Sequence, residues 1–143
     1  MIDVENMVMD HIISVMASSA TYSGANVTSA FVEEEAIFPT VTVRQKNNTP
    51  LRRTNTAASA ENYSTIQYEI TAYSSRMDAS KSECLEILKI CDAAMADIGF
   101  RRIHLSEPFN VSRTLTRRYA RYEAVVRAPY ESGNDTVFEV YRR

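Results

Sequence analysis

The sequence predicts an α+β fold in which two helices pack on one face of a mixed, mainly antiparallel sheet. Residues 63–74 alternate apolar and polar side chains, which is typical of a strand with one buried face. Residues 80–98 carry apolar side chains at helical spacing. Strand-like segments stand before and after this helix, and that order favours helices gathered on one face of a sheet. The 143 residues are enough for a single domain, residues 1–143, with its own core.

The first elements in chain order are a helix over residues 2–17 and two strands. The helix has acidic residues in its first turn, where they complement the positive end of the helix dipole. Strands are expected over residues 27–34 and 38–45, the second with Val41 and Val43 on one side. The apolar side of the helix is expected to consist of Met7, Ile12, Val15 and Met16.

A polar stretch, residues 46–62, follows the second strand and offers almost nothing to bury except Leu51. Loops of this length in compact domains are usually functional or disordered. We expect a polar hairpin arm here that orders on assembly, because burial in the isolated chain does not offset its backbone entropy. The strand over residues 63–74 comes next. Its inward side chains are expected to be Ile66, Tyr68, Ile70 and Ala72, and its outward ones Thr65, Gln67, Glu69 and Thr71.

The second half of the chain begins with the helix over residues 80–98. Ser80 and Glu83 have the spacing of a capping box at its start. Gly99 suits the left-handed residue that ends many helices. The elements expected after it are strands over residues 100–106 and 114–128 and a C-terminal arm over residues 129–143.

Composition limits the class of protein. The formal net charge of −2 argues against a general DNA-coating protein, which takes most of its affinity from a positive excess. Cys84 and Cys91 lie about two helical turns apart, too far for a disulfide within the helix, so we expect free buried thiols. The N-terminus has no basic leader region, and no apolar run is long enough to cross a bilayer. We therefore expect a soluble intracellular product without a membrane partner.

Arginine and tyrosine are concentrated in the strand over residues 114–128, which reads TLTRRYARYEAVVRA. Its smaller and more apolar side is expected to face the helices. The other side presents Arg117, Arg121 and Arg127, which can pair with carboxylates such as Glu69 on a neighbouring strand. Three interpretations remain open: a solvated sheet face with cross-strand ion pairs, a subunit interface rich in typical hot-spot residues, and a nucleic-acid-binding surface.

No pattern in the sequence indicates catalysis. His11 and His104 stand apart and lack the spacing of zinc ligands. No serine lies in a Gly-x-Ser-x-Gly motif, and three glycines leave no common phosphate-binding loop. The acidic run Glu33-Glu34-Glu35 is more typical of a solvated strand edge than of a metal site, because consecutive side chains alternate sides on a strand. We expect a protein that is not an enzyme and has no catalytic residues, metal or cofactor.

The order of segments resembles a known family. A strand reading FPTVTVRQ precedes the polar arm, and ENYSTIQYEITAYSS precedes a helix that ends in AMADIGFRR. A strand carrying SRTLTRRYARYEAVV follows. From about residue 37 to residue 127 this order resembles the tail-terminator, or tail-completion, proteins of long-tailed bacteriophages, also described as minor capsid or head–tail joining proteins. The most specific part is Gly99-Phe100 followed by the arginine–tyrosine strand.

The resemblance implies a small α+β virion protein that is assembled in the host cytoplasm and forms a homo-oligomeric ring, typically hexameric. Such a ring sits on the head-proximal end of the tail tube, stops its polymerisation and offers a docking face to the neck or connector protein of the head. Genome DNA passes through it without specific binding. The expected subunit or tube interface consists of Leu51, Arg52, Arg53, Arg117, Tyr119, Arg121 and Arg127. The expected channel lining is Glu33, Glu34 and Glu35, whose carboxylates repel the DNA backbone.

Alternative functions remain open at this point. One is a tail-tube or head-completion protein of the same virion, which is structural but occupies another position. Another is a nucleic-acid-binding regulator that uses the arginine cluster, and an enzyme with an unmarked site is a third. Binding that weakens steeply with salt would support the regulator, whereas a ring that persists in high salt would support the terminator.

Overall fold

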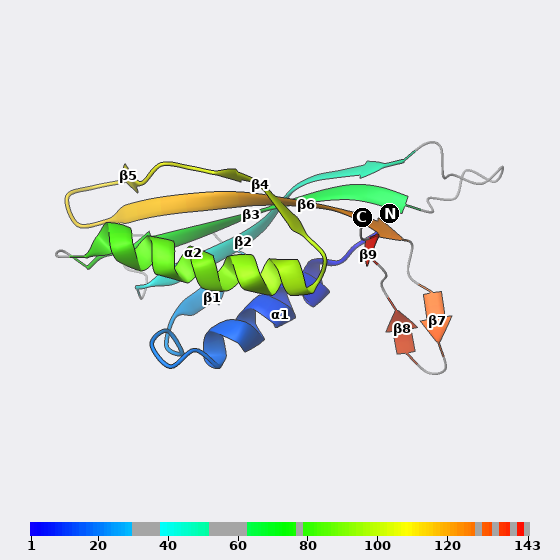
Figure 1. The fold of residues 1–143 in the computed structure, drawn as a ribbon, viewed down its shortest axis with the longest axis horizontal. Helices are drawn as coiled ribbons and strands as arrows, with labels where there is room; N and C mark the ends of the chain where they lie inside the picture. Colours follow the sequence, from blue (N-terminus) through cyan, green and yellow to red (C-terminus); the bar gives the residue numbers. More distant parts are fainter. Residues whose placement is uncertain are drawn as a thin grey trace.

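The chain folds as a sheet with two helices, α1 (Glu5–Ala17) and α2 (Ser80–Asp97), on one of its faces (Figure 1). The sheet runs along the top of the view, α2 lies beneath it, and α1 lies below, next to α2. The predicted α+β class is therefore confirmed. The computed structural model describes residues 1–29, 38–51, 63–76, 79–127, 130–132, 135–137 and 140–141.

Within the described residues, seven strands form the main sheet and two form a separate hairpin. The main sheet contains β1 (Asn26–Thr28), β2 (Thr40–Pro50), β3 (Tyr63–Ser74), β4 (Arg101–Leu105), β5 (Phe109–Asn110), β6 (Thr116–Arg127) and β9 (Val140–Tyr141). The hairpin consists of β7 (Tyr130–Ser132) and β8 (Asp135–Val137).

Strand β6 lies at the centre of the sheet and organises its pairing. It pairs antiparallel with β3 along the whole of both strands, and β3 pairs antiparallel with β2. The short strands β4, β5 and β9 also pair antiparallel with β6. The pair β1–β2 is parallel, which makes the sheet mixed. The arginine–tyrosine segment, which forms β6, therefore pairs with four other described strands.

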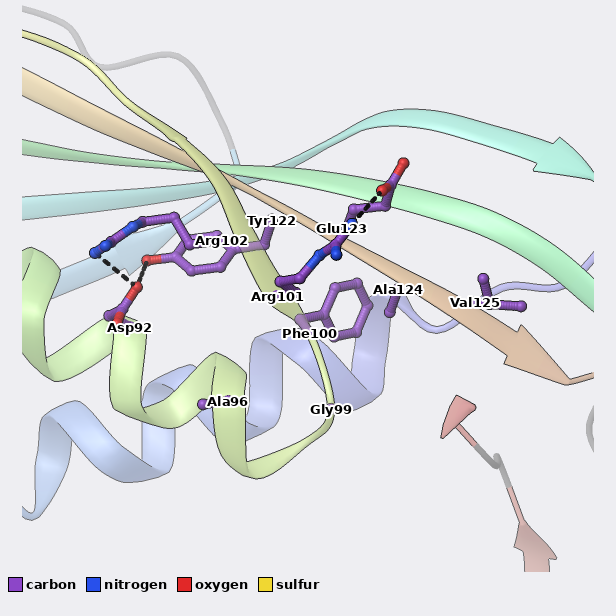
Figure 2. Close-up of a pocket in the computed structure, with 10 residues that line it drawn as sticks. All are labelled: Asp92, Ala96, Gly99, Phe100, Arg101, Arg102, Tyr122, Glu123, Ala124 and Val125. Carbon is purple, nitrogen blue, oxygen red and sulfur yellow. Dashed lines mark hydrogen bonds and ion pairs between the residues drawn. The ribbon is translucent and has the colours of Figure 1, made fainter. Parts of the chain in front are cut away.

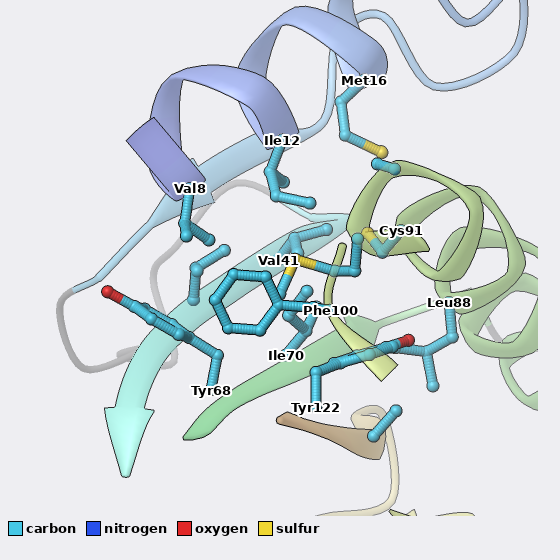
Figure 3. Packing of buried hydrophobic residues seen from close by; sticks show 14 of the residues in the cluster. Val8, Ile12, Met16, Val41, Tyr68, Ile70, Leu88, Cys91, Phe100 and Tyr122 are labelled. Carbon is cyan, nitrogen blue, oxygen red and sulfur yellow. The ribbon is translucent and has the colours of Figure 1, made fainter. Parts of the chain in front are cut away.

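Helix α1 contributes one buried stripe to the core: Val8, Ile12 and Met16, spaced four residues apart (Figure 3). Spacing of four keeps side chains on one side of a helix. Ile12 and Met16 were predicted to be apolar contacts and are buried. Met7 and Val15, also predicted, are only half-buried at the margin of the core, and Val8 takes the central position instead.

Helix α2 packs against β3 and β6 and carries both cysteines into the core. Cys84 and Cys91 are free and buried, as predicted. The Cys84 thiol donates to the carbonyl oxygen of Ala72 in β3 at 3.4 Å. Burial raises the pKa of Cys84 to about 11 and that of Cys91 to about 12, so both thiols remain protonated at neutral pH. The buried residues of this helix are Cys84, Ile87, Leu88, Cys91, Ala94 and Met95.

The predicted capping box at the start of α2 is wrong. The N-cap residue is Ala79, and no side chain caps the helix. The Ser80 hydroxyl instead lies 2.9 Å from the hydroxyl of Thr116 in β6. The Glu83 carboxylate accepts a hydrogen bond from Ser74 at 2.8 Å. Both side chains are thus used in contacts between the helix and the sheet rather than within the helix.

The end of α2 follows the prediction. Gly99 adopts a φ of 89°, the left-handed region that favours glycine. Its N–H donates to Ala96 O at 3.0 Å, and the N–H of Phe100 donates to Met95 O at 2.9 Å. These two bonds form a Schellman motif, which turns the chain sharply from the helix into β4.

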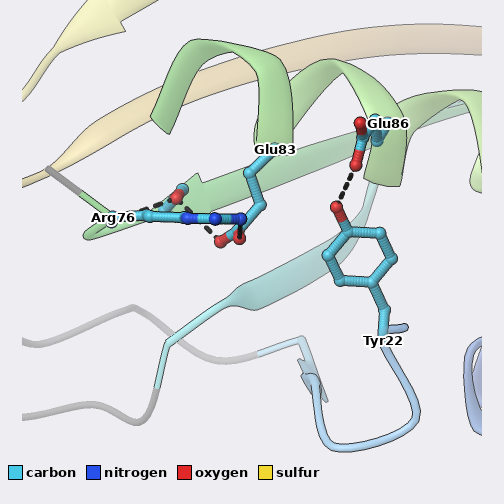
Figure 4. Close-up of polar contacts among 5 residues, drawn as sticks. Tyr22, Arg76, Glu83 and Glu86 are labelled. Atoms are coloured by element: carbon cyan, nitrogen blue, oxygen red, sulfur yellow. Dashed lines mark hydrogen bonds and ion pairs between the residues drawn. The ribbon is translucent and has the colours of Figure 1, made fainter. Parts of the chain in front are cut away.

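Polar contacts tie the loop after α1 and the end of β3 to α2 (Figure 4). The Tyr22 hydroxyl donates to the Glu86 carboxylate. Burial, followed by this carboxylate, raises the pKa of Tyr22 to about 12, so it remains a donor at neutral pH. Arg76, just after β3, forms an ion pair at 3.8 Å with Glu83 in the first turn of α2.

Some predicted boundaries differ from the structure. The predicted strand 38–45 continues to Pro50, with a register shift at Lys46, and its polar second half pairs with β3. Residues 46–50 therefore belong to β2, and the rest of the predicted arm, residues 52–62, lies outside the described residues. The predicted strand 27–34 corresponds to β1, and its second part also lies outside them. No helix in the described residues has both the length and the apolarity to cross a membrane.

The position of Ile12 in the core predicts a large stability effect. Ile12→Ala should lower the free energy of unfolding by about 2–5 kcal/mol, because it opens a cavity between α1 and the sheet. Ile13→Ala is the matched control: its side chain is 44% exposed in the free subunit, so unfolding of the monomer should change by no more than about 0.5 kcal/mol. Urea unfolding of both variants measures the difference. Equal losses of unfolding free energy would contradict the assignment of Ile12 to the buried side of α1 and Ile13 to its exposed side.

Candidate functional site

The candidate functional site is the face of β3 and β6 that is turned away from the helices, which we call the outer face. Side chains of β6 alternate as predicted: Ala120, Tyr122 and Val126 are buried toward the helices. Arg117 and Arg121 point the other way and are exposed. The two interpretations that need these arginines on an accessible surface, a protein interface and a nucleic-acid surface, both remain possible on this geometry alone.

A network of charges occupies the middle of the outer face. Arg121 Nε lies 3.0 Å from Glu69 Oε2, which confirms the predicted pairing with this carboxylate for Arg121. Lys46 Nζ lies 3.7 Å from Glu69 Oε1. The Glu69 side chain is only 14% exposed, so these two cations, rather than water, stabilise its negative charge. Here the charges are largely satisfied within the subunit.

A second carboxylate, Glu123, is satisfied in the next row of the sheet. Arg101 in β4 lies 3.6 Å from its Oε2 atom. Gln67 Nε2 donates to its Oε1 atom at 3.1 Å. Arg101, Glu123 and Gln67 stand on three neighbouring strands, β4, β6 and β3. The charges in the middle of the outer face are thus paired within the subunit.

Aromatic rings accompany the arginines on the same face. The ring of Tyr119 lies between two neighbours: its centroid is 5.7 Å from that of His104 and 5.4 Å from Arg121 Cζ. The Arg117 guanidinium lies 5.0 Å from the centroid of Phe109. Contacts of this kind between a cation and a ring contribute about 0.5–1 kcal/mol at exposed sites.

One end of the outer face differs from the middle because its arginine has no carboxylate. Arg117 stands between Phe109 on β5 and Tyr73 on β3 in the register of the sheet. Among the described residues, no carboxylate pairs with it. Phe109 is 56% exposed and Val111, two residues on, is 47% exposed. We call Tyr73, Phe109, Val111 and Arg117 the arginine–aromatic end.

Hydrogen bonds fix the turn that carries this end. The N–H of Val111 donates to Leu115 O at 2.8 Å and extends the β5–β6 ladder by one pair. The Thr116 hydroxyl donates to Asn110 Oδ1 at 3.1 Å. The Ser112 hydroxyl accepts from the N–H of Thr114 at 3.3 Å. The exposed ring of Phe109 is therefore held on a well-bonded hairpin, which lowers the entropy lost when a partner binds.

The predicted site residues fall in three groups. Arg117, Tyr119, Arg121 and Arg127 lie together on the outer face. Leu51 follows β2, is half-buried, and donates its N–H to Tyr63 O at 2.9 Å. The predictions for Arg52, Arg53, Glu33, Glu34 and Glu35 lie outside the described residues.

Sequence reasoning missed Phe109 and Tyr73. Phe109 stands in a segment taken for a connection, although it forms a two-residue strand beside β6. Tyr73 continues the outward set of β3 by simple alternation, so the signal for it was present.

A hollow of about 520 Å³ lies where β4 meets β6 above the end of α2 (Figure 2). Its polar groups are engaged with one another. Asp92 Oδ1 lies 3.3 Å from Arg102 Nη1 and accepts from the Tyr122 hydroxyl at 3.1 Å. Burial, helped by Asp92, raises the pKa of Tyr122, so its hydroxyl is a donor rather than a base.

The described residues contain no group of three His, Cys, Asp or Glu side chains that could hold a metal ion. His104 lies on the outer face beside Tyr119, and His11 lies in α1, where its Nε2 atom is 3.9 Å from Asp97 Oδ2. The two histidines are therefore used in separate parts of the fold.

A scan of the chain against protein-family models gives no match, and a search of curated proteins also gives none. Evidence for function therefore comes from the order of segments in the sequence and from the outer face.

The charge network predicts measurable coupling between Arg121 and Glu69. A double-mutant cycle of Arg121→Ala and Glu69→Ala should give a coupling free energy of roughly 0.5–1 kcal/mol, because the pair is close but Arg121 is half-exposed. The same cycle with Arg117→Ala and Glu69→Ala is the control and should give almost none. Equal coupling in the two cycles, measured by urea unfolding, would contradict the pairing.

Proposed function

We propose that this protein is a structural component of a bacteriophage virion that forms a ring, with six subunits expected, on the head-proximal end of the tail tube. The ring stops polymerisation of the tube and presents a docking face to the neck or connector protein of the head. The protein works by assembly rather than catalysis and uses no cofactor. The observation that carries the proposal is the outer face, which displays arginines and aromatic rings in a fixed arrangement. The resemblance in the order of segments supports the same proposal.

The pattern of charge on the outer face favours protein contacts over nucleic acid. Phosphate binding needs cations that are free to replace counterions. Arg121 and Lys46 share Glu69, and Arg101 shares Glu123, so much of the positive charge is already neutralised. The exposed apolar side chains of Phe109 and Val111 fit a protein partner better than a phosphate backbone. Aromatic residues and arginine are the typical anchors of protein interfaces.

Genome DNA passes through such a ring, and a channel serves this purpose best when it does not hold the DNA. We propose that Glu33, Glu34 and Glu35 line it, because carboxylates repel phosphates over about 8 Å at physiological salt. A structure of the assembled ring with these three residues on its outer rim and arginines in the channel would contradict this assignment.

The mass of the protein in solution and its images with purified tail tubes test the proposed function. We expect a closed ring that survives high salt and caps one end of each tube. Replacing Arg117 and Arg121 together by Ala should weaken self-association or tube docking and leave DNA affinity unchanged. Lys89→Ala, on the exposed side of α2, is the matched control and should assemble normally.

Two results would contradict the proposal. One is a protein that stays monomeric at all concentrations and never binds tubes. The other is a double variant that assembles normally but loses measurable DNA binding, which would favour the nucleic-acid-binding regulator.

A further inference from the structure

Charge is divided unevenly along the chain, and the fold places helix α1 and strand β6 on different surfaces. The first lysine or arginine is Arg44, whereas six acidic residues precede it. Helix α1 lies within this acidic part and contains no lysine or arginine. The outer face, in contrast, is formed largely by β6, which contributes Arg117, Arg121 and Arg127 to it. A helix surface with negative charge and a sheet surface with positive charge thus belong to the same subunit.

The exposed side of α1 combines charge with an apolar group. Asp10 and Ile13 are both exposed, and their spacing of three residues places them next to each other on the helix. Among the described residues, nothing pairs with the Asp10 carboxylate. This stripe therefore offers a free carboxylate beside an exposed aliphatic side chain.

The large exposed apolar side chains show the same division. In the described part of the chain they fall into two groups, one at the N-terminus and α1 and the other on β4, β5 and the turn that follows. Phe109 of the second group lies against Arg117, which pairs with no carboxylate among the described residues. The first group consists of Met1 and Ile13, and the second of Ile103, Phe109 and Val111.

We propose that the arginine–aromatic end of one subunit docks the exposed stripe of α1 of a second copy of this chain. Arg117 pairs with Asp10 of the neighbouring copy, and Phe109 and Val111 cover its Ile13. The proposal rests on the ring proposed above and names the surfaces that build it. Within the described part of the subunit, Arg117 has no carboxylate partner and Asp10 has no cation partner, so each surface supplies what the other lacks. Apolar groups flank both.

The arrangement of the fold suits a ring. Helix α1 and the outer face lie on opposite sides of the sheet and helix layers (Figure 1). A contact between two different surfaces of the same protein is heterologous, and repetition of such a contact closes into a ring when the rotation permits. A two-fold dimer would instead need one surface to match itself, and two arginine–aromatic ends would repel each other.

Charge reversal tests the pairing. The single variants Arg117→Glu and Asp10→Arg should each weaken self-association at least about tenfold, because each sets like charges against each other. An equimolar mixture of the two variants restores opposite charges at every contact of an alternating ring. The mixture and the double variant should therefore regain assembly. Analytical ultracentrifugation measures all four samples, and thermal melting confirms that each variant is folded.

Two further reversals are matched controls. Glu5→Arg changes an exposed carboxylate on another side of α1, and Lys89→Glu reverses a cation on α2. Both should assemble like the unchanged protein. Each control changes the net charge of the protein by as much as a test variant does. The controls therefore separate loss of the local contact from a general effect of net charge.

The outcomes distinguish this inference from the proposed function. Rings that persist in both single variants would overturn the Arg117–Asp10 contact and leave the proposed ring intact. Single variants that fall apart without rescue in the mixture or in the double variant would also overturn the contact. A protein that never forms a ring, with or without tail tubes, would remove the proposed function itself.

Discussion

The structure depends on the antiparallel register between β3 and β6, which runs from Tyr63 opposite Arg127 to Ser74 opposite Thr116. This register decides which side of each strand meets the helices. It places Tyr68, Ile70 and Tyr122 in the core, where their burial supports the packing of both helices. A shift of one residue would send these side chains to water and would bring charged groups inward. Because so much apolar surface depends on it, the register is strongly specified.

The same register makes two arginines of one strand chemically different. Arg121 stands opposite Glu69 and is bound to it, whereas Arg117, four residues earlier, stands opposite Tyr73 and beside Phe109. The first contributes to the stability of the subunit. The second pairs with no carboxylate in the described residues and lies beside a hairpin that is held by its own hydrogen bonds. The different surroundings of the two arginines thus follow from their positions along one strand, and the assembly we propose uses Arg117.

The sequence was sufficient where burial leaves a periodic pattern. The alternation of β3 and β6, the end of α2 at Gly99 and the contact of Arg121 with Glu69 were all predicted. The second half of β2 was not predicted to be a strand. Its side chains are polar on both sides, and its pairing with β3 uses backbone groups, so the sequence shows no alternation there. The capping box failed because Ser80 and Glu83 find partners in the sheet. Phe109 was missed because a strand of two residues has no period.

The central claim is that the outer face is the surface buried by assembly, while the helix-facing side of β6 is core. Hydroxyl-radical footprinting of the free subunit and of the assembled ring tests it directly. Phe109 and Tyr119 should react in the free subunit and lose most of that reactivity in the ring, because both lie on the outer face. Tyr122, which is buried, should remain unreactive in both. Unchanged reactivity of Phe109 and Tyr119 in an assembled ring would contradict the account.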